Sequence, residues 1–416
     1  MKWSRYAALF LMVLVVAFVY CKSAFAQQTM PLPGPKREMA EVQRPSLTGS
    51  DPKPQDAAKA IRAAFDKYEV VGMGAAHGNQ DLDDFILRLI RNSELPGKIN
   101  DIVVECGNSL YQPILDRYIA GDDVPLDEAR QVWRNTTQPM CSVSAFYEEL
   151  FPLVRRINQK LPAARKFRVV AGDPPIDWSK VKTRDDVWRF MDRNPTIASV
   201  MEKEVLSKHR KALMLFGTRH LYHSSGENAP MLLQSAVQVY EKNYPGLTLV
   251  IADHTGFGND SPLAKYNNEF ESRMASWPIP SLVQDMSGTW LADLLDKTQT
   301  LGGGAILFRV GKDGKRTESP VDSSGVPASK KVDAYLYLGP RDLLLKEPRP
   351  AEVFLDKEYM AEMQRRAAIM GGDPIADQAN PEKISDRDYS PFFYDPNEMQ
   401  EMMGFQKMGL GPAPPK

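Results

Sequence analysis

Three apolar stretches that end in histidine decide the fold: VVGMGAAH at residues 70–77, ALMLFGTRH at residues 212–220 and LTLVIADH at residues 247–254. Each contains an apolar run of strand length that is followed by polar residues or glycine. The chain of 416 residues has only five histidines, and four of them (His77, His220, His223 and His254) follow these runs. Because parallel strands present their C-terminal ends at one edge of a sheet, the pattern predicts a site at that edge.

The rest of the chain alternates strand-like and amphipathic segments. Two further strands are predicted at residues 102–106 and 167–171. Helical spacing of apolar residues predicts the helices between the strands, at residues 57–68, 82–90, 113–119, 126–133 and 146–157. This alternation predicts an α/β fold with a mainly parallel central sheet and helices on both faces.

A C-terminal extension follows, in which the pattern changes. Strands are predicted at residues 305–310 and 333–339, with a tight turn at residues 312–315. Residues 352–369 are predicted to be helical.

The chain divides into four predicted regions. Residues 1–26 have the basic start, short apolar run and small-residue cleavage pattern of a secretory signal peptide. An uncleaved anchor is the alternative interpretation. Residues 27–54 form a polar, proline-rich linker, residues 55–345 the α/β domain, and residues 346–416 a helix and a disordered tail. We therefore expect an exported protein, periplasmic or secreted, with no stable membrane span after cleavage.

The composition excludes some partners. The chain is 43% hydrophobic and 25% charged, which fits a globular protein with a large core. Its formal net charge of -1 argues against binding to nucleic acid, which requires a strongly basic surface. The expected partner is a small molecule or haem.

Two cysteines, Cys106 and Cys141, remain after the predicted cleavage. An oxidising compartment permits a disulfide between them. Cys106 also ends an apolar strand, so a buried free thiol is an equally good interpretation. The sequence leaves the two alternatives open.

Polar residues at successive strand ends are the candidates for chemistry. Familiar motifs such as a phosphate-binding loop or a nucleophile elbow are missing. What remains is His77, Glu105, Asp173, Arg219 and His220, with Asp253 and His254 after the last strand. Imidazoles and carboxylates together could bind a divalent cation or activate a water. The alternative is that such residues cap helices and turns, which is the favoured interpretation for Asp253 and His254.

Two Gly-x-x-His motifs, at residues 74–77 and 217–220, lie far apart in the sequence, with Glu105 after the intervening strand. This pattern resembles the superfamily of erythromycin-esterase-like proteins, ChaN-like haem-uptake proteins and Tiki/TraB proteins. The resemblance implies an α/β fold whose active cleft is lined by His77, Glu105 and His220. Family members commonly carry glutamate directly after the first glycine, where this chain has Ala75.

Three functions follow as hypotheses. The first is an exported ester or amide hydrolase, in which His77, held by Glu105, takes a proton from water and Arg219 stabilises the oxyanion. A divalent metal held by His77, Glu105, Asp173 and His220 could assist. The second is a haem- or metal-binding uptake protein without catalysis, with His220, His223 or Tyr222 as the haem ligand. The third is a catalytically degenerate scaffold, which Ala75 favours.

One geometric prediction is common to all three hypotheses. If the strands are parallel, His77, Glu105, Asp173 and His220 open onto one cleft, and the two Gly-x-x-His turns face each other across it.

Overall fold

A computed structural model describes eight stretches of the chain: residues 47–74, 78–226, 234–257, 263–298, 306–310, 316–320, 326–348 and 350–370. The predicted signal peptide, most of the linker and the tail beyond residue 370 lie outside the described residues. Three members of the first Gly-x-x-His motif, Ala75, Ala76 and His77, also lie outside them.

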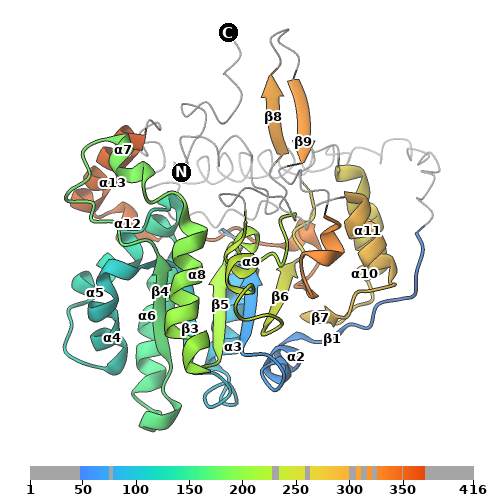
Figure 1. The fold of residues 1–416 in the computed structure, drawn as a ribbon, viewed down its shortest axis with the longest axis horizontal. Coiled ribbons are helices and arrows are strands. Elements are labelled where there is room, and N and C mark those ends of the chain that lie inside the picture. Colours follow the sequence, from blue (N-terminus) through green and yellow to red (C-terminus); the bar gives the residue numbers. More distant parts are fainter. Residues whose placement is uncertain are drawn as a thin grey trace, which may run out of the picture. The chain divides into compact units, whose positions relative to one another are not determined.

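The described chain is built on an eight-stranded sheet with the order β1-β7-β10-β6-β2-β5-β3-β4 (Figure 1). The strands are β1 (Gln55–Asp56), β2 (Val70–Gly74), β3 (Asp101–Asn108), β4 (Arg168–Asp173), β5 (Ala212–Phe216), β6 (Thr248–Asp253), β7 (Ser281–Gln284) and β10 (Ala334–Tyr337). The six strands from β10 to β4 are parallel, whereas β7 and β1 pair antiparallel at the edge. The predicted mainly parallel sheet is confirmed.

Side chains of the central strands alternate between two apolar layers. In β2, Val71 and Met73 belong to one buried cluster and Val70 to the other. In β3, Ile102 and Val104 face the first cluster and Val103 the second. This is the pattern of strands that are buried on both faces, and it explains why they appear in the sequence as continuous apolar runs.

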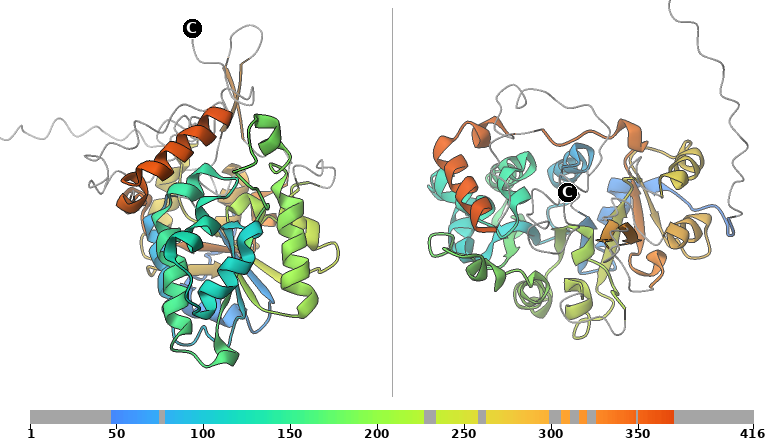
Figure 2. Two further views of the ribbon diagram at one scale, coloured as in Figure 1. Left: turned by 90° about the vertical axis from the view of Figure 1, so that its left-hand side faces the viewer. Right: turned by 90° about the horizontal axis from the view of Figure 1, so that it is seen from above.

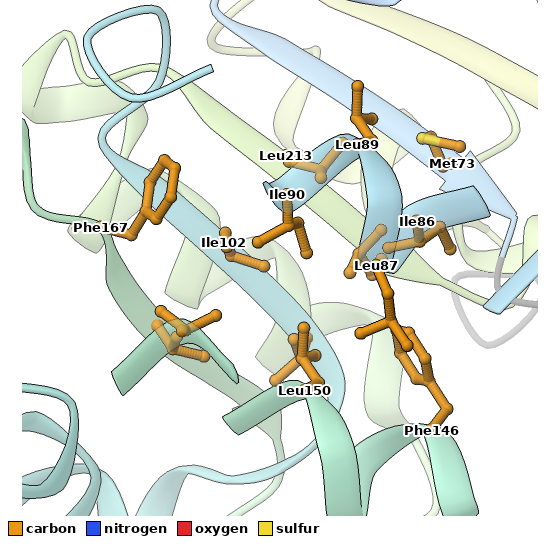
Figure 3. Close-up of a cluster of buried hydrophobic side chains, with 14 of the residues drawn as sticks. Met73, Ile86, Leu87, Leu89, Ile90, Ile102, Phe146, Leu150, Phe167 and Leu213 are labelled. Carbon is orange, nitrogen blue, oxygen red and sulfur yellow. The ribbon is translucent and has the colours of Figure 1, made fainter. Parts of the chain in front are cut away.

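Helices cover both faces of the sheet, as predicted (Figures 1 and 2). The first cluster holds α2 (Ala57–Ala64), α3 (Gln80–Arg91), α4 (Gln112–Ala120), α5 (Leu126–Arg134) and α6 (Ala145–Asn158). The second holds α8 (Arg193–Glu204), α9 (Ala236–Tyr240), α10 (Asn267–Met274) and α11 (Trp290–Thr298). Figure 3 shows the centre of the first cluster, where Ile86, Leu89 and Ile90 of α3 lie among Ile102, Leu150 and Leu213.

Elements outside these two layers follow the predictions in part. The strands β8 (Ile306–Val310) and β9 (Arg316–Pro320) pair antiparallel, and the turn expected between them lies outside the described residues. The helix predicted at residues 352–369 is present as α12 (Ala351–Phe354) and α13 (Lys357–Met370). A short α7 (Arg184–Trp188) precedes α8. Strand β7 was not predicted, because four residues at the edge of a sheet give little periodic signal.

Cys106 of β3 and Cys141 form a disulfide, which resolves the alternative that the sequence left open. Both side chains are fully buried. The bond ties the loop after α5 to the strand that carries Glu105. Among the described residues, no helix is both long and apolar enough to cross a membrane.

We expect that replacing both cysteines by alanine lowers the free energy of unfolding. The bond closes a loop of 35 residues, and chain-entropy arguments give about 3–4 kcal/mol for a loop of that size. Denaturant unfolding of the oxidised protein and the Cys106→Ala/Cys141→Ala variant measures the difference. A reductant should destabilise the parent but leave the variant unchanged. Equal unfolding midpoints for the two oxidised proteins would contradict the prediction.

Candidate active site

The two Gly-x-x-His motifs follow strands that are direct neighbours. Strands β2 and β5 pair in parallel, with Gly74 opposite Phe216 at their C-terminal ends. The predicted closeness of these two strand ends is confirmed. His77 itself lies outside the described residues, so its side chain remains a prediction.

These neighbouring strands continue into helices on opposite faces of the sheet. β2 leads to α3, which packs in the first apolar cluster, and β5 leads to α9, which packs in the second. A crevice opens at such a point in an α/β sheet, because the two connections diverge, and ligands bind there. The second motif, with His220, therefore lies at the position where this fold forms a binding site.

Glu105 of β3 is buried, with 2% of its surface exposed. Its Oε2 accepts a hydrogen bond from the backbone N–H of Gly217 at 2.6 Å, and its Oε1 accepts one from Arg193 Nη1 at 2.8 Å. A Cβ at Gly217 would lie 3.3 Å from Glu105 Oε2, so the absent side chain allows this close approach. The carboxylate thus fixes the start of the second Gly-x-x-His turn.

Asp173, the last residue of β4, is fully buried. Its Oδ2 accepts from the backbone N–H of Thr137 at 2.5 Å, and its Oδ1 accepts from Thr137 Oγ1 at 3.0 Å and from Arg193 Nε at 2.8 Å. Burial raises the pKa of Asp173, while the guanidinium and the Thr137 donors favour its ionised form. Asp173 and Glu105 were predicted to open onto one cleft, but both are buried, and one arginine connects the two carboxylates.

Arg193, the first residue of α8, is the centre of the site and was missed by sequence reasoning. Its guanidinium bridges Glu105 and Asp173 and is 6% exposed. Burial alone would lower the pKa of Arg193, but the two carboxylates hold it above its ordinary value. Its Nη2 has no hydrogen-bond partner among the described residues. Nη2 is therefore a buried donor available to an oxygen of a ligand.

His220 contacts the same arginine. Its Nε2 lies 3.1 Å from Arg193 Nη1 and 3.5 Å from Glu105 Oε1, and its Nδ1 lies 2.5 Å from Asn194 Oδ1. Asn194 donates through Nδ2 to the carbonyl oxygen of Gln234, so its Oδ1 is the acceptor toward His220. Nδ1 therefore carries the proton of the neutral ring, and Nε2 carries the lone pair.

Burial keeps the His220 ring neutral. It lowers the pKa of His220, although the Glu105 carboxylate acts in the opposite direction. The cations of Arg193 and Arg219 also disfavour a second positive charge. Arg219 itself is exposed, at the surface of the turn.

The predicted metal ligands that the structure describes contact a guanidinium group and do not converge on a common position for a metal ion. Glu105, Asp173 and His220 all contact Arg193. In the part of the chain that the structure describes, no group of three or more histidine, cysteine or acidic side chains has the spacing of a metal site. A site that includes His77 stays a prediction.

His223 is not arranged as a haem ligand, contrary to one hypothesis. Its Nδ1 lies 2.8 Å from Glu241 Oε2 and its Nε2 lies 2.7 Å from Asp333 Oδ2, so both ring nitrogens are engaged. Tyr222 is half-buried and packs in the second apolar cluster. His254 is structural, as favoured from the sequence, because its ring bonds Tyr335 and Glu271 inside the core.

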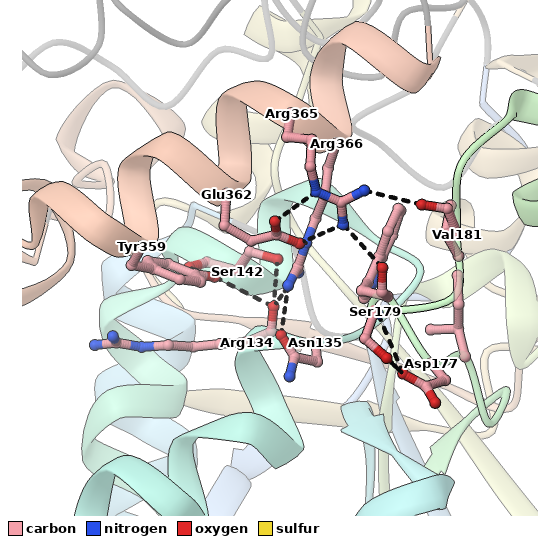
Figure 4. A network of polar contacts seen from close by, with 12 residues as sticks. Arg134, Asn135, Ser142, Asp177, Ser179, Val181, Tyr359, Glu362, Arg365 and Arg366 are labelled. Atoms are coloured by element: carbon pink, nitrogen blue, oxygen red, sulfur yellow. Dashed lines mark hydrogen bonds and ion pairs between the residues drawn. The ribbon is translucent and has the colours of Figure 1, made fainter.

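The C-terminal helix α13 supports the loop that follows α5, as Figure 4 shows. Arg366 donates to the carbonyl oxygen of Arg134 at 2.8 Å and to Asn135 Oδ1 at 2.5 Å. Tyr359 donates to the carbonyl oxygens of Arg134 at 3.2 Å and Ser142 at 2.9 Å. The helix therefore fixes the backbone of this loop from outside the sheet.

The same helix reaches the site through a second arginine. Arg365 donates to the carbonyl oxygen of Trp178 at 2.9 Å (Figure 4). Trp178 Nε1 donates to the carbonyl oxygen of Thr136 at 2.9 Å, and the next residue, Thr137, binds Asp173. A short chain of contacts thus connects α13 to the site.

A comparison with solved structures found several similar chains at low sequence identity. Similar solved structures include a succinoglycan biosynthesis protein (10% identity, TM-score 0.44, covering 69% of this chain and 94% of that chain). They also include the erythromycin esterase EreC in its open conformation (12% identity, TM-score 0.41, covering 70% of this chain and 96% of that chain). A third is ChaN of Campylobacter jejuni with cofacial haem (11% identity, TM-score 0.31, covering 50% of this chain and 88% of that chain). No protein-family model and no curated protein matches the chain. Function is therefore argued from the geometry of this chain.

We expect His223 to remain protonated throughout the neutral range. Burial alone would lower its pKa, but the bonds to Asp333 and Glu241 outweigh burial and raise the pKa from 6.5 to about 10. Its contribution to stability is fully present below pH 6.5 and is lost as the pH rises through about 10. An NMR titration of the imidazole signals, with His223→Gln to identify the resonance, measures this. A midpoint near the ordinary value of 6.5 would contradict the arrangement.

Proposed function

We propose that this protein is an exported hydrolase that cleaves an ester or amide bond in the cleft at the C-terminal ends of β2, β5, β3 and β4. The observation that carries the proposal is the neutral His220 held against the buried Glu105–Arg193–Asp173 cluster. A fixed imidazole, a buried cation and two carboxylates at a strand-end crevice are the groups that acyl transfer to water requires.

Each group has a role in this proposal. His77 is the base that takes a proton from water as the water oxygen attacks the carbonyl carbon. Arg193 offers Nη2 to the developing oxyanion, since its other nitrogens already bind Glu105 and Asp173. His220 keeps the guanidinium oriented. The sequence analysis assigned the oxyanion role to Arg219, which is exposed.

Export to an oxidising compartment is part of the proposal. The disulfide between Cys106 and Cys141 supports it, because such bonds form and persist outside the reducing cytosol. The haem hypothesis is not carried further, since the ring nitrogens of both His220 and His223 are engaged by other side chains. Metal assistance stays open for a site that includes His77, and metal analysis of protein purified without chelator decides it.

We expect purified protein to hydrolyse at least one member of a panel of esters and amides. His77→Ala should reduce turnover by at least about 100-fold, the usual contribution of a general base. Arg193→Lys should also reduce turnover, because the single nitrogen of lysine cannot reproduce the spacing of Nε, Nη1 and Nη2 in the planar guanidinium. His209→Ala is the matched control, because His209 is exposed and lies outside the cleft. Unchanged turnover by His77→Ala would contradict the proposal.

A further inference from the structure

Asp253 lies at the same edge of the sheet as the proposed site. It is the last residue of β6, and β6 pairs in parallel with β2 on the side opposite to β5. Its side chain is almost fully buried, with 6% of the residue exposed. The strand order therefore places Asp253 and the turn of His220 on either side of the end of β2.

Gly74 brings these two sides together. A Cβ at Gly74 would lie 2.7 Å from Asp253 Oδ1 and 2.5 Å from Thr218 Oγ1, which is closer than real Cβ contacts. Thr218 belongs to the same turn as His220. The space that any other side chain would fill at position 74 is therefore occupied by a carboxyl and a hydroxyl group. This is a physical reason for the first glycine of the motif.

The Asp253 carboxyl group is only partly satisfied by hydrogen bonds, because a backbone N–H at Asp253 is its one hydrogen-bond donor among the described residues. Its Oδ2 has no hydrogen-bond partner among the described residues. The neighbouring His254, in contrast, bonds through both ring nitrogens. The sequence favoured a capping role for both residues, whereas the structure shows His254 bonded to the side chains of Tyr335 and Glu271.

The surroundings of Asp253 favour its neutral, protonated form. Asp83 of α3 interacts electrostatically with Asp253, and Asp83 Oδ2 is also buried without a partner. The negative charges of Glu347 and Asp84 also raise the pKa of Asp83. Tyr335 of β10 is a further titratable group that interacts electrostatically with Asp253.

The pKa values of the two aspartates follow from this setting. Burial raises the pKa of Asp253 to about 6. Burial and the neighbouring carboxylates raise the pKa of Asp83 well above its ordinary value. The backbone hydrogen bond to Asp253 acts in the opposite direction but is outweighed by burial, so the group keeps its proton to a higher pH than a free aspartate.

We propose that Asp253 is the proton donor to the leaving group in the hydrolysis. This inference rests on the proposed function and adds to it the class of substrate: alkyl esters or amides, whose basic leaving groups need a proton as the bond breaks. Strands β5 and β6 flank β2, so their backbones are separated by two strand spacings, about 10 Å. A scissile bond that lies across the end of β2 has the turn of His220 on one side and Asp253 on the other.

The proton transfers balance. The base takes one proton from water while the water oxygen bonds to the carbonyl carbon. The bond from that carbon to the leaving oxygen or nitrogen then breaks, and the Asp253 O–H proton moves to the leaving atom. The Asp253 carboxylate regains a proton from the protonated base through solvent. One water molecule is consumed, and no other reactant is needed.

The test compares Asp253→Asn with the parent on two esters of one acyl group, a p-nitrophenyl ester and an alkyl ester. Nitrophenolate is weakly basic and leaves without a proton, whereas a strongly basic alkoxide must receive a proton as it leaves. We expect turnover of the alkyl ester to fall at least about 100-fold in the variant, and turnover of the nitrophenyl ester to fall less than about 10-fold. In the parent, alkyl-ester turnover should fall as the pH rises above about 6, and this decline should be absent in the variant. Asp123→Asn, at an exposed carboxylate, is the control.

The outcomes separate the two proposals. If His77→Ala abolishes turnover while Asp253→Asn affects both esters equally or neither, the role of Asp253 is overturned and the hydrolase stands. If the parent hydrolyses neither these esters nor the panel, both proposals are overturned.

A folding measurement, independent of any substrate, tests the protonated state of Asp253. A carboxyl group whose folded pKa is raised loses its stabilising contribution as the pH rises through that pKa. Asp253→Asn should therefore melt at a temperature equal to or above that of the parent at about pH 8. A lower melting temperature for the variant at that pH would contradict the proposal.

Discussion

The bridge from Arg193 to Glu105 and Asp173 is the interaction on which the candidate site depends. The three side chains come from α8, β3 and β4, and each is at least nine-tenths buried. Removing Arg193 leaves two buried carboxylates without their cation, which is far more costly than losing a surface ion pair. The bridge also positions His220 and, through Glu105, the backbone of Gly217. The geometry of the cleft therefore follows from one cation.

The sheet topology brings these groups to one place. Parallel strands end at the same edge, and the helices after β2 and β5 pass to opposite faces of the sheet, the arrangement at which ligands bind in α/β folds. Around the crevice, contacts from outside the sheet limit the freedom of the loops. The disulfide at Cys106 and the two arginines of α13, Arg365 and Arg366, all act on the loops that carry Thr137 and its neighbours.

Local sequence patterns predicted the framework but not the centre of the site. The parallel strands were found because burial on both faces makes them continuous apolar runs, and the polar residues at their ends indicated Glu105, Asp173 and His220. Arg193 was missed because its partners lie 20 and 88 residues away, and no local pattern distinguishes it from a surface arginine. His223 was misinterpreted for the same reason, since its partner Asp333 is 110 residues away. Long-range charge pairing leaves no periodic signal in one sequence.

A double-mutant cycle on Arg193 and Glu105 tests the buried bridge most directly. The free energy of unfolding would be measured in denaturant near pH 7 for the parent, Arg193→Met, Glu105→Gln and the double variant. Arg193→Met should cost about 3–5 kcal/mol, because it leaves two buried carboxylates without their cation. Glu105→Gln should cost less, because Asp173 still pairs with Arg193. The double variant should be more stable than the sum of the two changes predicts, by about 1–3 kcal/mol. Additive effects would contradict the claim that Arg193 and Glu105 form the core of the site.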